Sequence, residues 1–367
     1  MKCTNPKPTG EYAVGTKTFS IKEPGEGLRS IASRLYYPVD KERVEGLEKA
    51  EYMSRDMAKA IKKTLKIPVN YDKITAEGKN ISECYPDAPK IESKKFPLIV
   101  FTHGCPSYRE ANSFLCIDLA SHGYVVMVVS HAPDAMLTEL DDGTKIPTDN
   151  KMVKEVYKPF LPAVLRLTKI VKMKGSNQEI ADTFDEFQFK YCEVPLEVIE
   201  KWKKETLVAL EYAKKNYSDL IDFEKGVGAA GHSLGGDTSY ALCCESPEFT
   251  CGINIDGAPF GDFRNAVLDK PFLQISCKDN EIVVARIYIR HTKKVYKVLF
   301  DKMQHLGFSD MKFMSPIMVG KLSPDVLHEN LCRCHLEFFD AYLAGRKDLP
   351  DLKSNESITV SEYEPDM

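Results

Sequence analysis

Short apolar runs separated by helical segments constrain the fold of this chain more than any other feature. The runs at 97–101 and 124–129 are apolar on both faces, and a helical segment at 111–121 lies between them. Similar runs recur at 226–230, 251–255, 271–275 and 295–300. Strands buried on both faces are typical of parallel sheets, whose connecting helices cover the two sides. The sequence therefore predicts an α/β fold with a mostly parallel central sheet.

Two further strands are expected before these runs, at 12–21 and 31–39, joined by a Pro/Gly-containing turn at 23–27. The segment 42–66 is predicted to be helical because apolar side chains recur every fourth residue along its second half. These are Met53, Met57, Ile61 and Leu65, with Lys59, Lys62 and Lys63 beside them. Such a stripe either packs on the sheet or rests on a lipid surface.

The stretch between the strands at 124–129 and 226–230 is longer than a simple crossover requires. We therefore expect an insertion at about 134–193, followed by a crossover helix at about 194–216. The insertion contains a predicted helical segment at about 151–172 that is interrupted by prolines. This segment could cap a site.

The chain reads as a single domain at 1–349, followed by a polar, acidic tail at 350–367 that we expect to be frayed. With 43% hydrophobic residues among 367, it can bury a sizeable core. Lys and Arg number 50 and Asp and Glu 54, so the net charge of -4 argues against bulk binding of nucleic acid.

The location of the protein is predicted from two absences in the sequence and from its cysteines. No apolar run approaches the roughly 20 residues of a membrane span, and no apolar signal-peptide core follows Met1. The 11 cysteines are then best read as reduced, buried thiols. These features favour a cytoplasmic protein, with peripheral membrane contact as a further option. A spacing like that of metal ligands occurs at Cys332, Cys334 and His335. The apolar helical pattern around them predicts instead that they are core residues.

The strongest chemical motif is Gly231-His232-Ser233-Leu234-Gly235-Gly236, which contains G-x-S-x-G. A strand of small residues precedes it and a helical segment at 237–244 follows. A serine on such a strand-to-helix turn is raised above the sheet, with a helix N-terminus behind it. The flanking glycines allow the backbone to pack closely. Ser233 is therefore the predicted nucleophile.

A nucleophilic serine requires a base, an orienting acid and donors for the oxyanion. His305 is the predicted base, because it lies in a loop after the last strand of the series. The predicted oxyanion donors are the backbone N–H groups of Leu234 and of Cys105, which follows His103-Gly104 at the end of an earlier strand. We expect the His103 ring to shape that loop and the Cys105 thiol not to act as a nucleophile.

Two carboxylates qualify as the acid. Asp256 and Asp279 each follow a predicted strand, and sites in open α/β sheets lie at the carboxyl ends of strands. Their positions alone do not separate them.

Several segments together resemble the platelet-activating factor acetylhydrolase family, the plasma and type II intracellular group of calcium-independent phospholipases. The segments are Arg34-Leu35-Tyr36-Tyr37-Pro38, Phe101-Thr102-His103-Gly104, the stretch 117–124, the stretch 231–236, Cys251-Gly252-Ile253-Asn254-Ile255-Asp256 and His305-Leu306-Gly307-Phe308-Ser309-Asp310. The resemblance extends over about residues 10 to 345.

The resemblance implies an α/β-hydrolase fold, with Ser233, Asp256 and His305 as the catalytic triad and Cys105 and Leu234 as oxyanion donors. It thus favours Asp256 over Asp279. The chain departs from relatives at Cys105, where an apolar Leu is usual, and at 257–259, where Gly-Ala-Pro replaces Ala-Trp. These departures bear on acyl and headgroup preference.

The implied activity is hydrolysis of a short sn-2 acyl ester in a phospholipid such as platelet-activating factor. The alternatives are an esterase or lipase of broader substrate range and a non-catalytic hydrolase-like binding protein. No metal or organic cofactor is expected, because the sequence contains no calcium loop and no dinucleotide fingerprint.

Overall fold

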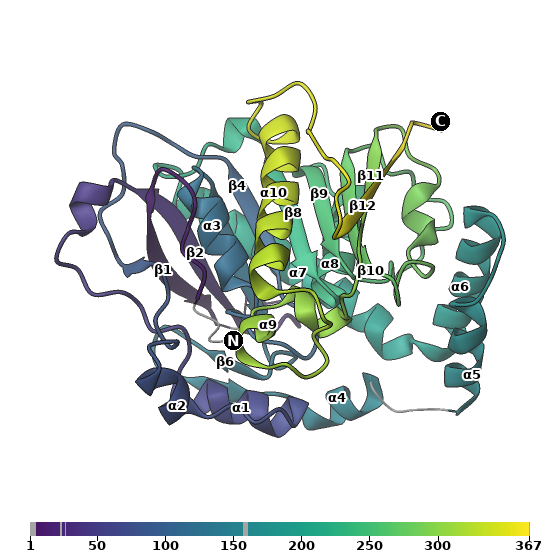
Figure 1. Cartoon of the computed structure of the whole chain (residues 1–367), viewed down its shortest axis with the longest axis horizontal. Coiled ribbons are helices and arrows are strands. Elements are labelled where there is room, and N and C mark those ends of the chain that lie inside the picture. The colour runs from purple at the N-terminus through teal and green to yellow at the C-terminus, as the bar shows by residue number, and fades with distance from the viewer. Residues whose placement is uncertain (1–4, 23, 26, 157–160, 367) are drawn as a thin grey trace.

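The computed structural model describes residues 5–22, 24–25, 27–156 and 161–366 (Figure 1). The strands are β1 Ala13–Ile21, β2 Ile31–Val39, β3 Tyr85–Pro86, β4 Leu98–Thr102, β5 Val125–His131, β6 Leu137–Glu139, β7 Lys145–Pro147, β8 Val227–His232, β9 Phe249–Ile255, β10 Phe272–Cys277, β11 Val295–Phe300 and β12 Ile358–Tyr363. The α-helices are α1 Arg55–Leu65, α2 Tyr71–Ala76, α3 Ser113–Ser121, α4 Asn150–Val156, α5 Leu161–Ile170, α6 Asn177–Tyr191, α7 Glu193–Asn216, α8 Leu234–Glu245, α9 Met311–Met314 and α10 Pro324–Tyr342.

The main sheet has the strand order β12-β11-β10-β9-β8-β4-β5-β2-β1-β3. Strands β5, β4, β8, β9, β10 and β11 are mutually parallel, whereas β12 and β2 add to the two ends of this set in antiparallel pairing. The predicted α/β architecture with a mostly parallel centre is confirmed. The apolar runs form these central strands because they are buried on both faces.

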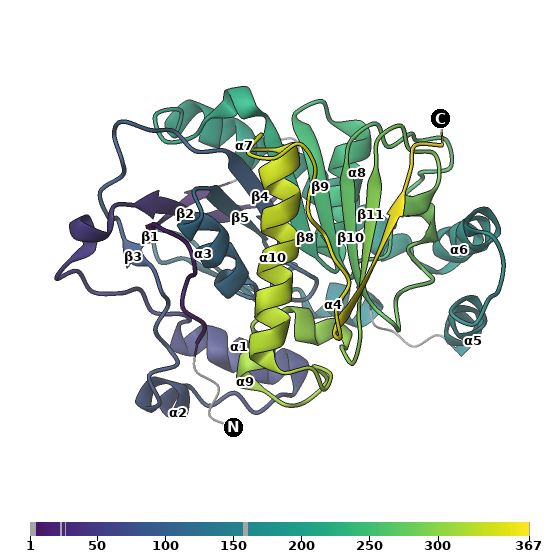
Figure 2. The ribbon, with the colours of Figure 1, turned by 45° about the horizontal axis from the view of Figure 1, so that its top comes forward.

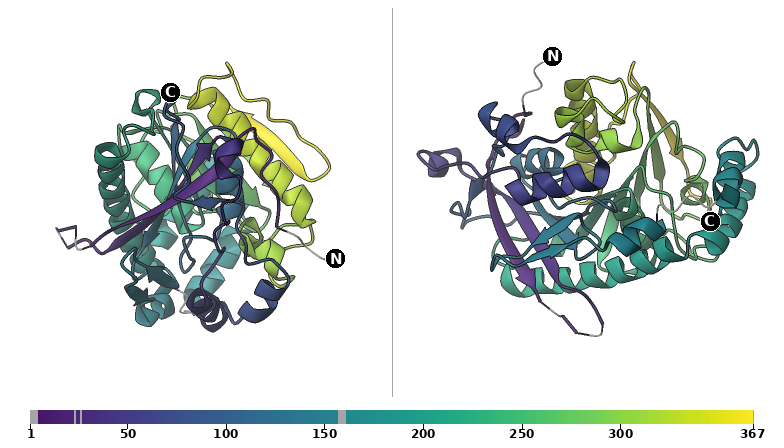
Figure 3. Two further views of the ribbon diagram at one scale, coloured as in Figure 1. Left: turned by 90° about the vertical axis from the view of Figure 1, so that its left-hand side faces the viewer. Right: turned by 90° about the horizontal axis from the view of Figure 1, so that it is seen from below.

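Two layers of helices cover the sheet. Helices α3 and α10 pack together on one face, and α7 and α8 pack on the other. Figures 2 and 3 show α10 and α7 on opposite sides of the strands. The buried Trp202 of α7 anchors one apolar layer, and Phe338 and Phe339 of α10 anchor the other.

The chain order reverses between β4 and β8. From β4 the chain adds β5 on one side, and from β8 it adds β9, β10 and β11 on the other. When the loops after two neighbouring strands run in opposite directions, a crevice forms between them at the carboxyl edge. Ligands bind at such crevices in open α/β sheets. The loop after β4 and the turn after β8 meet at this crevice.

The helix predicted over 42–66 is wrong in its first half. The backbone takes a positive φ of 81° at Gly46, and α1 begins only at Arg55, where the Ser54 side chain accepts the N–H of Met57. Met57 and Ile61 are buried against Tyr108 and Phe114, so the stripe faces the interior. The segment is broken because glycine and a capping serine fall within the apolar pattern.

The frayed tail predicted after Leu349 is also wrong in part. Residues Ile358–Tyr363 form β12, which pairs along the whole of β11 and buries Ile358. The insertion at 134–193 contains the β6–β7 hairpin and helices α4, α5 and α6. Residues 157–160 of its predicted helical segment lie outside the described part.

Among the residues described, no helix combines the length and the apolar character needed to cross a bilayer. None of the ten cysteines that the structure describes forms a disulfide.

Candidate active site

Ser233 occupies a strained turn between β8 and α8. Its backbone has φ 58° and ψ −128°, an unusual conformation for a residue with a side chain. The two glycines of the motif are required by close contact, because a Cβ on Gly231 would lie 2.2 Å from the carbonyl oxygen of Gly235. A Cβ on Gly235 would lie 2.0 Å from the carbonyl oxygen of Thr102 in β4. The turn therefore presses against the end of β4 and presents the Ser233 hydroxyl at the crevice.

His305 follows β11 and joins Ser233 to a buried carboxylate. Its Nε2 lies 3.0 Å from Ser233 Oγ, and its Nδ1 lies 2.7 Å from Asp256 Oδ2. Because a carboxylate only accepts, Nδ1 carries the proton and Nε2 is free to accept from the serine hydroxyl. The carboxylate is fully buried, whereas 44% of the His305 side chain is exposed. This chain of contacts can move a proton away from Ser233 during attack.

Asp256 is held by the loop after β10. Its Oδ1 accepts the backbone N–H of Cys277 at 2.7 Å, and its Oδ2 accepts from Asn280 Nδ2 at 2.9 Å as well as from His305. Asp279 is exposed in the same loop. Of the two carboxylates that sequence position left open, the structure brings Asp256 to the histidine.

The sequence analysis did not predict a role for Asn280. This residue follows β10 at the carboxyl edge of the sheet, as Asp256 follows β9 and His305 follows β11. The role of His232, whose ring nitrogen Nε2 donates to the carbonyl oxygen of His305 at 3.1 Å, was not predicted either. Burial first, and then the neighbouring His305, lower the pKa of His232 to about 3. His232 is therefore neutral at physiological pH and fixes the backbone that carries His305.

The predicted oxyanion donors flank Ser233. A Cβ on Gly104 would lie 3.0 Å from Ser233 Cβ, so the loop that carries the Cys105 N–H runs directly beside the serine. The Leu234 N–H belongs to the first residue of α8, where backbone N–H groups point out of the helix. Burial raises the pKa of the Cys105 thiol, which is directed at the carbonyl oxygen of Asp134. The thiol is therefore protonated and unsuited to attack.

A buried network supports the loop after β4. The His103 ring contacts the carbonyl oxygen of Gly104 at 2.6 Å and accepts the N–H of His131 at 3.3 Å. Burial lowers the pKa of His103 to about 3, so the ring is neutral. Trp202 packs edge-on against His103 and donates to Asp134. These contacts hold the loop at the position expected for an oxyanion donor.

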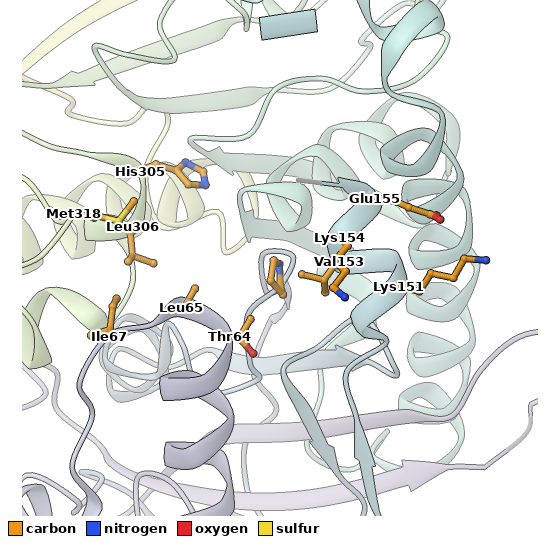
Figure 4. A pocket seen from close by; sticks show the side chains of 11 residues that line it. Thr64, Leu65, Ile67, Lys151, Val153, Lys154, Glu155, His305, Leu306 and Met318 are labelled. Atoms are coloured by element: carbon orange, nitrogen blue, oxygen red, sulfur yellow. The ribbon is translucent and has the colours of Figure 1, made fainter. Parts of the chain in front are cut away.

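Two cavities of very different size adjoin the histidine. A groove of about 910 Å³ runs between α1, α4 and the His305 loop, and Figure 4 shows the side chains from these three segments arranged around it. A second chamber of about 70 Å³ lies against Ser233, and Met136, Met311 and Tyr108 are among the residues that line it. The helix of the insertion that was expected to cap a site, α4, forms one wall of the groove.

The described part of the chain holds one group of side chains with metal-like spacing, namely Asp118, His328 and Cys332. It includes no residue of the Ser233 site.

Comparison with known proteins shows the family and the fold of this chain. The model of the platelet-activating factor acetylhydrolase, isoform II, family matches residues 1–331. The chain belongs to this family. The platelet-activating factor acetylhydrolase of Canis lupus familiaris is 25% identical over 94% of this chain and 78% of its own length. That of Cavia porcellus is 22% identical over 96% and 80%.

A solved structure, a ferulic acid esterase from Streptomyces cinnamoneus, superposes with a TM-score of 0.73 at 20% identity. The match covers 98% of this chain and 99% of the other, which shows that they share the α/β-hydrolase fold. Family and fold together make this protein a hydrolase of lipid or other ester bonds.

Proposed function

We propose that the protein is a calcium-independent serine esterase that removes a short sn-2 acyl group from phospholipids such as platelet-activating factor. The observation that carries the proposal is the continuous chain of contacts from Ser233 through His305 to Asp256. The large groove and small chamber that meet at this chain support the substrate class.

In the proposed reaction, Ser233 Oγ attacks the ester carbonyl carbon while its proton passes to His305 Nε2. The N–H groups of Cys105 and Leu234 donate to the oxyanion. The tetrahedral intermediate breaks the bond to the lyso-lipid oxygen, which takes the proton from His305. A water molecule, deprotonated by the same nitrogen, then hydrolyses the acyl-serine and frees the carboxylic acid. Asp256 fixes the imidazole tautomer and stabilises the imidazolium.

The sizes of the two cavities support a placement for each of the two parts of the proposed substrate. The chamber against Ser233, of about 70 Å³, has a size that suits an acetyl group better than a long acyl chain. The leaving oxygen faces His305, which lines the groove of about 910 Å³. The groove therefore suits the glycerol with its long alkyl chain. Its apolar lining, including Leu65, Ile67 and Leu306, is compatible with a lipid tail.

We further propose that the groove opens toward a lipid surface. Its rim carries Met318, with 64% of the residue exposed, and the neighbouring Ile317 is 46% exposed. Large exposed apolar side chains beside a basic helix are typical of interfacial contact. An esterase of broader range remains the alternative, and substrate length separates the two.

The deciding experiment measures hydrolysis of 1-O-alkyl phosphatidylcholines that differ only in the sn-2 chain, from acetyl to palmitoyl. We expect the rate to fall as the chain lengthens. Met136→Ala should enlarge the chamber and raise the rate on hexanoyl relative to acetyl substrate. Met318→Ala, at the groove rim, is the matched control and should leave that ratio unchanged. A wild-type rate that rises steadily to palmitoyl would favour a general lipase.

Ser233→Ala should lower kcat by roughly 10⁴- to 10⁶-fold in a folded protein, because the triad acts as a unit. A fluorophosphonate should label wild-type protein at one equivalent and leave this variant unlabelled. Retention of more than a tenth of the activity would reject the serine mechanism, and stoichiometric labelling would reject the non-catalytic alternative.

EDTA should leave the rate unchanged, whereas a loss restored by calcium would reject calcium independence.

A further inference from the structure

A mixed set of ligand-type side chains lies between α3 and α10. Asp118 projects from α3, and His328 and Cys332 lie one turn apart on α10. One carboxylate oxygen, one ring nitrogen and the thiol sulfur all lie within 4.8 Å of one another. Oxygen, nitrogen and sulfur from these three residue types are the donors that Zn²⁺ takes in proteins.

The Asp118 carboxylate has one oxygen in use and one available. Its Oδ1 accepts both the backbone N–H of Thr9 at 2.7 Å and the Thr9 hydroxyl at 2.9 Å. Its Oδ2 is buried, and the Cys332 thiol donates to the carboxylate. The ring of His122 is 3.9 Å from Oδ2 and pairs with the Thr9 hydroxyl. A thiol is a weak donor for a buried carboxylate, and a cation that replaced the thiol proton would stabilise both groups.

The spacing of His328 and Cys332 suits a shared metal ion. The sulfur lies 3.7 Å from His328 Nδ1 and 3.6 Å from Nε2. Bonds of about 2.3 Å to sulfur and about 2.0 Å to nitrogen at a tetrahedral angle place the two ligand atoms about 3.5 Å apart. The pair can therefore bind one ion with little movement of α10.

The cluster is reachable from solvent. A surface cavity of about 320 Å³ is lined by both α10 ligands and by Thr9. Three carboxylates, those of Asp325, Glu329 and Glu337, also line it, against one guanidinium, that of Arg333. The acidic wall favours entry of a cation, and the cavity has room for a bound water.

The neighbouring residues that first suggested metal spacing do not take part. Cys334 and His335 are fully buried in the core, and His335 is paired with the carbonyl oxygen of Leu331. Cys332 belongs instead with His328, four residues earlier, because side chains at i and i+4 share one face of a helix.

We propose that Asp118, His328 and Cys332 bind one zinc ion, with a water molecule from the cavity as the fourth ligand. The Cys332 thiol loses its proton to solvent when the metal–sulfur bond forms. The ion joins α3 to α10 on the face of the sheet opposite α7. It has a stabilising role and is separate from the ester chemistry, so the proposal does not depend on the proposed function.

Cobalt provides a direct probe, because a cobalt–thiolate bond gives a near-ultraviolet charge-transfer band and tetrahedral cobalt absorbs in the visible. Chelator-treated protein should develop both with one equivalent of Co²⁺, and Zn²⁺ should abolish them. Cys332→Ala should lose the charge-transfer band. Cys334→Ala, a buried thiol two positions along the same helix, should keep it. Absence of the band in the wild type, or its survival in Cys332→Ala, overturns the proposal.

Zinc affinity, measured by competition with a chromophoric chelator, tests the other two ligands. His328→Ala and Asp118→Asn should each weaken zinc binding by more than about 100-fold, beyond the loss typical of outer residues. Asparagine at 118 keeps an acceptor for Thr9. Asp325→Asn, which removes a carboxylate from the cavity wall only, should change affinity by less than about 10-fold. Zinc should raise the Tm of the wild type and not that of Cys332→Ala. Equal effects of the two Asp→Asn changes would reject a site at Asp118.

Discussion

Asp256 combines a strained backbone with a fully buried carboxylate. Its φ is 58°, and its two oxygens accept from the Cys277 N–H, from Asn280 and from His305. The hydrogen bonds hold the carboxylate in one orientation before substrate arrives, so the imidazole is held as well. Strain of this kind is retained where the surroundings enforce it.

Asp256→Asn should lower kcat by about 10⁴-fold, by analogy with the protease triad, because the amide favours the wrong imidazole tautomer. Asp279→Asn is the matched control, since Asp279 is an exposed side chain in the loop that follows β10. It should retain activity within about threefold, as exposed substitutions away from the reacting atoms usually do. Steady-state kinetics on a short-chain ester measures both, and the reverse order would move the acid to Asp279.

Asp237 is a second buried carboxyl behind the serine. Neither of its oxygens has a hydrogen-bond partner among the described residues, and burial first, then the charge of Asp256, raises its pKa well above the usual value. An acid with a raised pKa in the folded state contributes least to stability at high pH. Its contribution is fully present below the unfolded pKa near 4 and declines as the pH rises toward the folded pKa.

Asp237→Asn should remove that decline, because the amide is neutral throughout. We expect the Tm of the variant minus that of the wild type to increase between pH 5 and pH 8. Thermal unfolding followed by circular dichroism at both pH values provides the measurement. A difference that does not change with pH would show that the carboxyl is not the titrating group.

At the residue scale, motif and chain order predicted a site at Ser233 and His305, and the structure places these two side chains 3.0 Å apart. It could not choose between Asp256 and Asp279 from position alone, since both follow strands. The choice depends on which side chain the strand end directs at His305. Asn280 and His232 were missed because their contacts join segments far apart in the chain.

Among the elements, the central strands were predictable because burial on both faces gives continuous apolar runs. Strand β12 was not predictable, because it is an edge strand in which polar residues interrupt the apolar ones and only Ile358 is buried. Its pairing with β11 depends on tertiary contact, which overrides local composition. The break before α1 has a local cause instead, since Gly46 and the capping Ser54 set where the helix begins.

Removal of Ile358–Tyr363 and the residues beyond should lower the Tm and increase light scattering on heating. The truncation leaves β11 as an unpaired edge and uncovers the surface that Ile358 buries. Ser361→Ala, at an exposed position of the same strand, should behave like the wild type. An unchanged Tm after truncation would mean that β12 contributes no stability to the sheet.

The whole molecule places its chemistry and its basic surface at one side. The crevice between β4 and β8 opens into the groove, and α1 and α4 lie together at the same lower edge in Figure 1. Helix α1 exposes Lys59, Lys62 and Lys63, and α4 exposes Lys151 and Lys154, which also line the groove. The chain as a whole has a net charge of -4, so composition alone does not reveal this cluster of positive charge on the groove side.

The cluster of lysines predicts that the groove side is the side of the molecule that binds a lipid surface. Reversal of Lys59, Lys62 and Lys63 to Glu should weaken binding to anionic vesicles, since each basic residue near such a surface contributes about 1 kcal/mol. Hydrolysis of a soluble short-chain ester should not change, because these side chains are exposed, line neither cavity, and leave the buried face of α1 untouched. Reversal of Lys201, Lys204 and Lys215, exposed on α7 across the sheet, is the matched control and should leave vesicle binding intact. Equal losses from the two triple variants would indicate attraction by overall charge, and unchanged binding in the α1 variant would reject this side as the membrane-facing one.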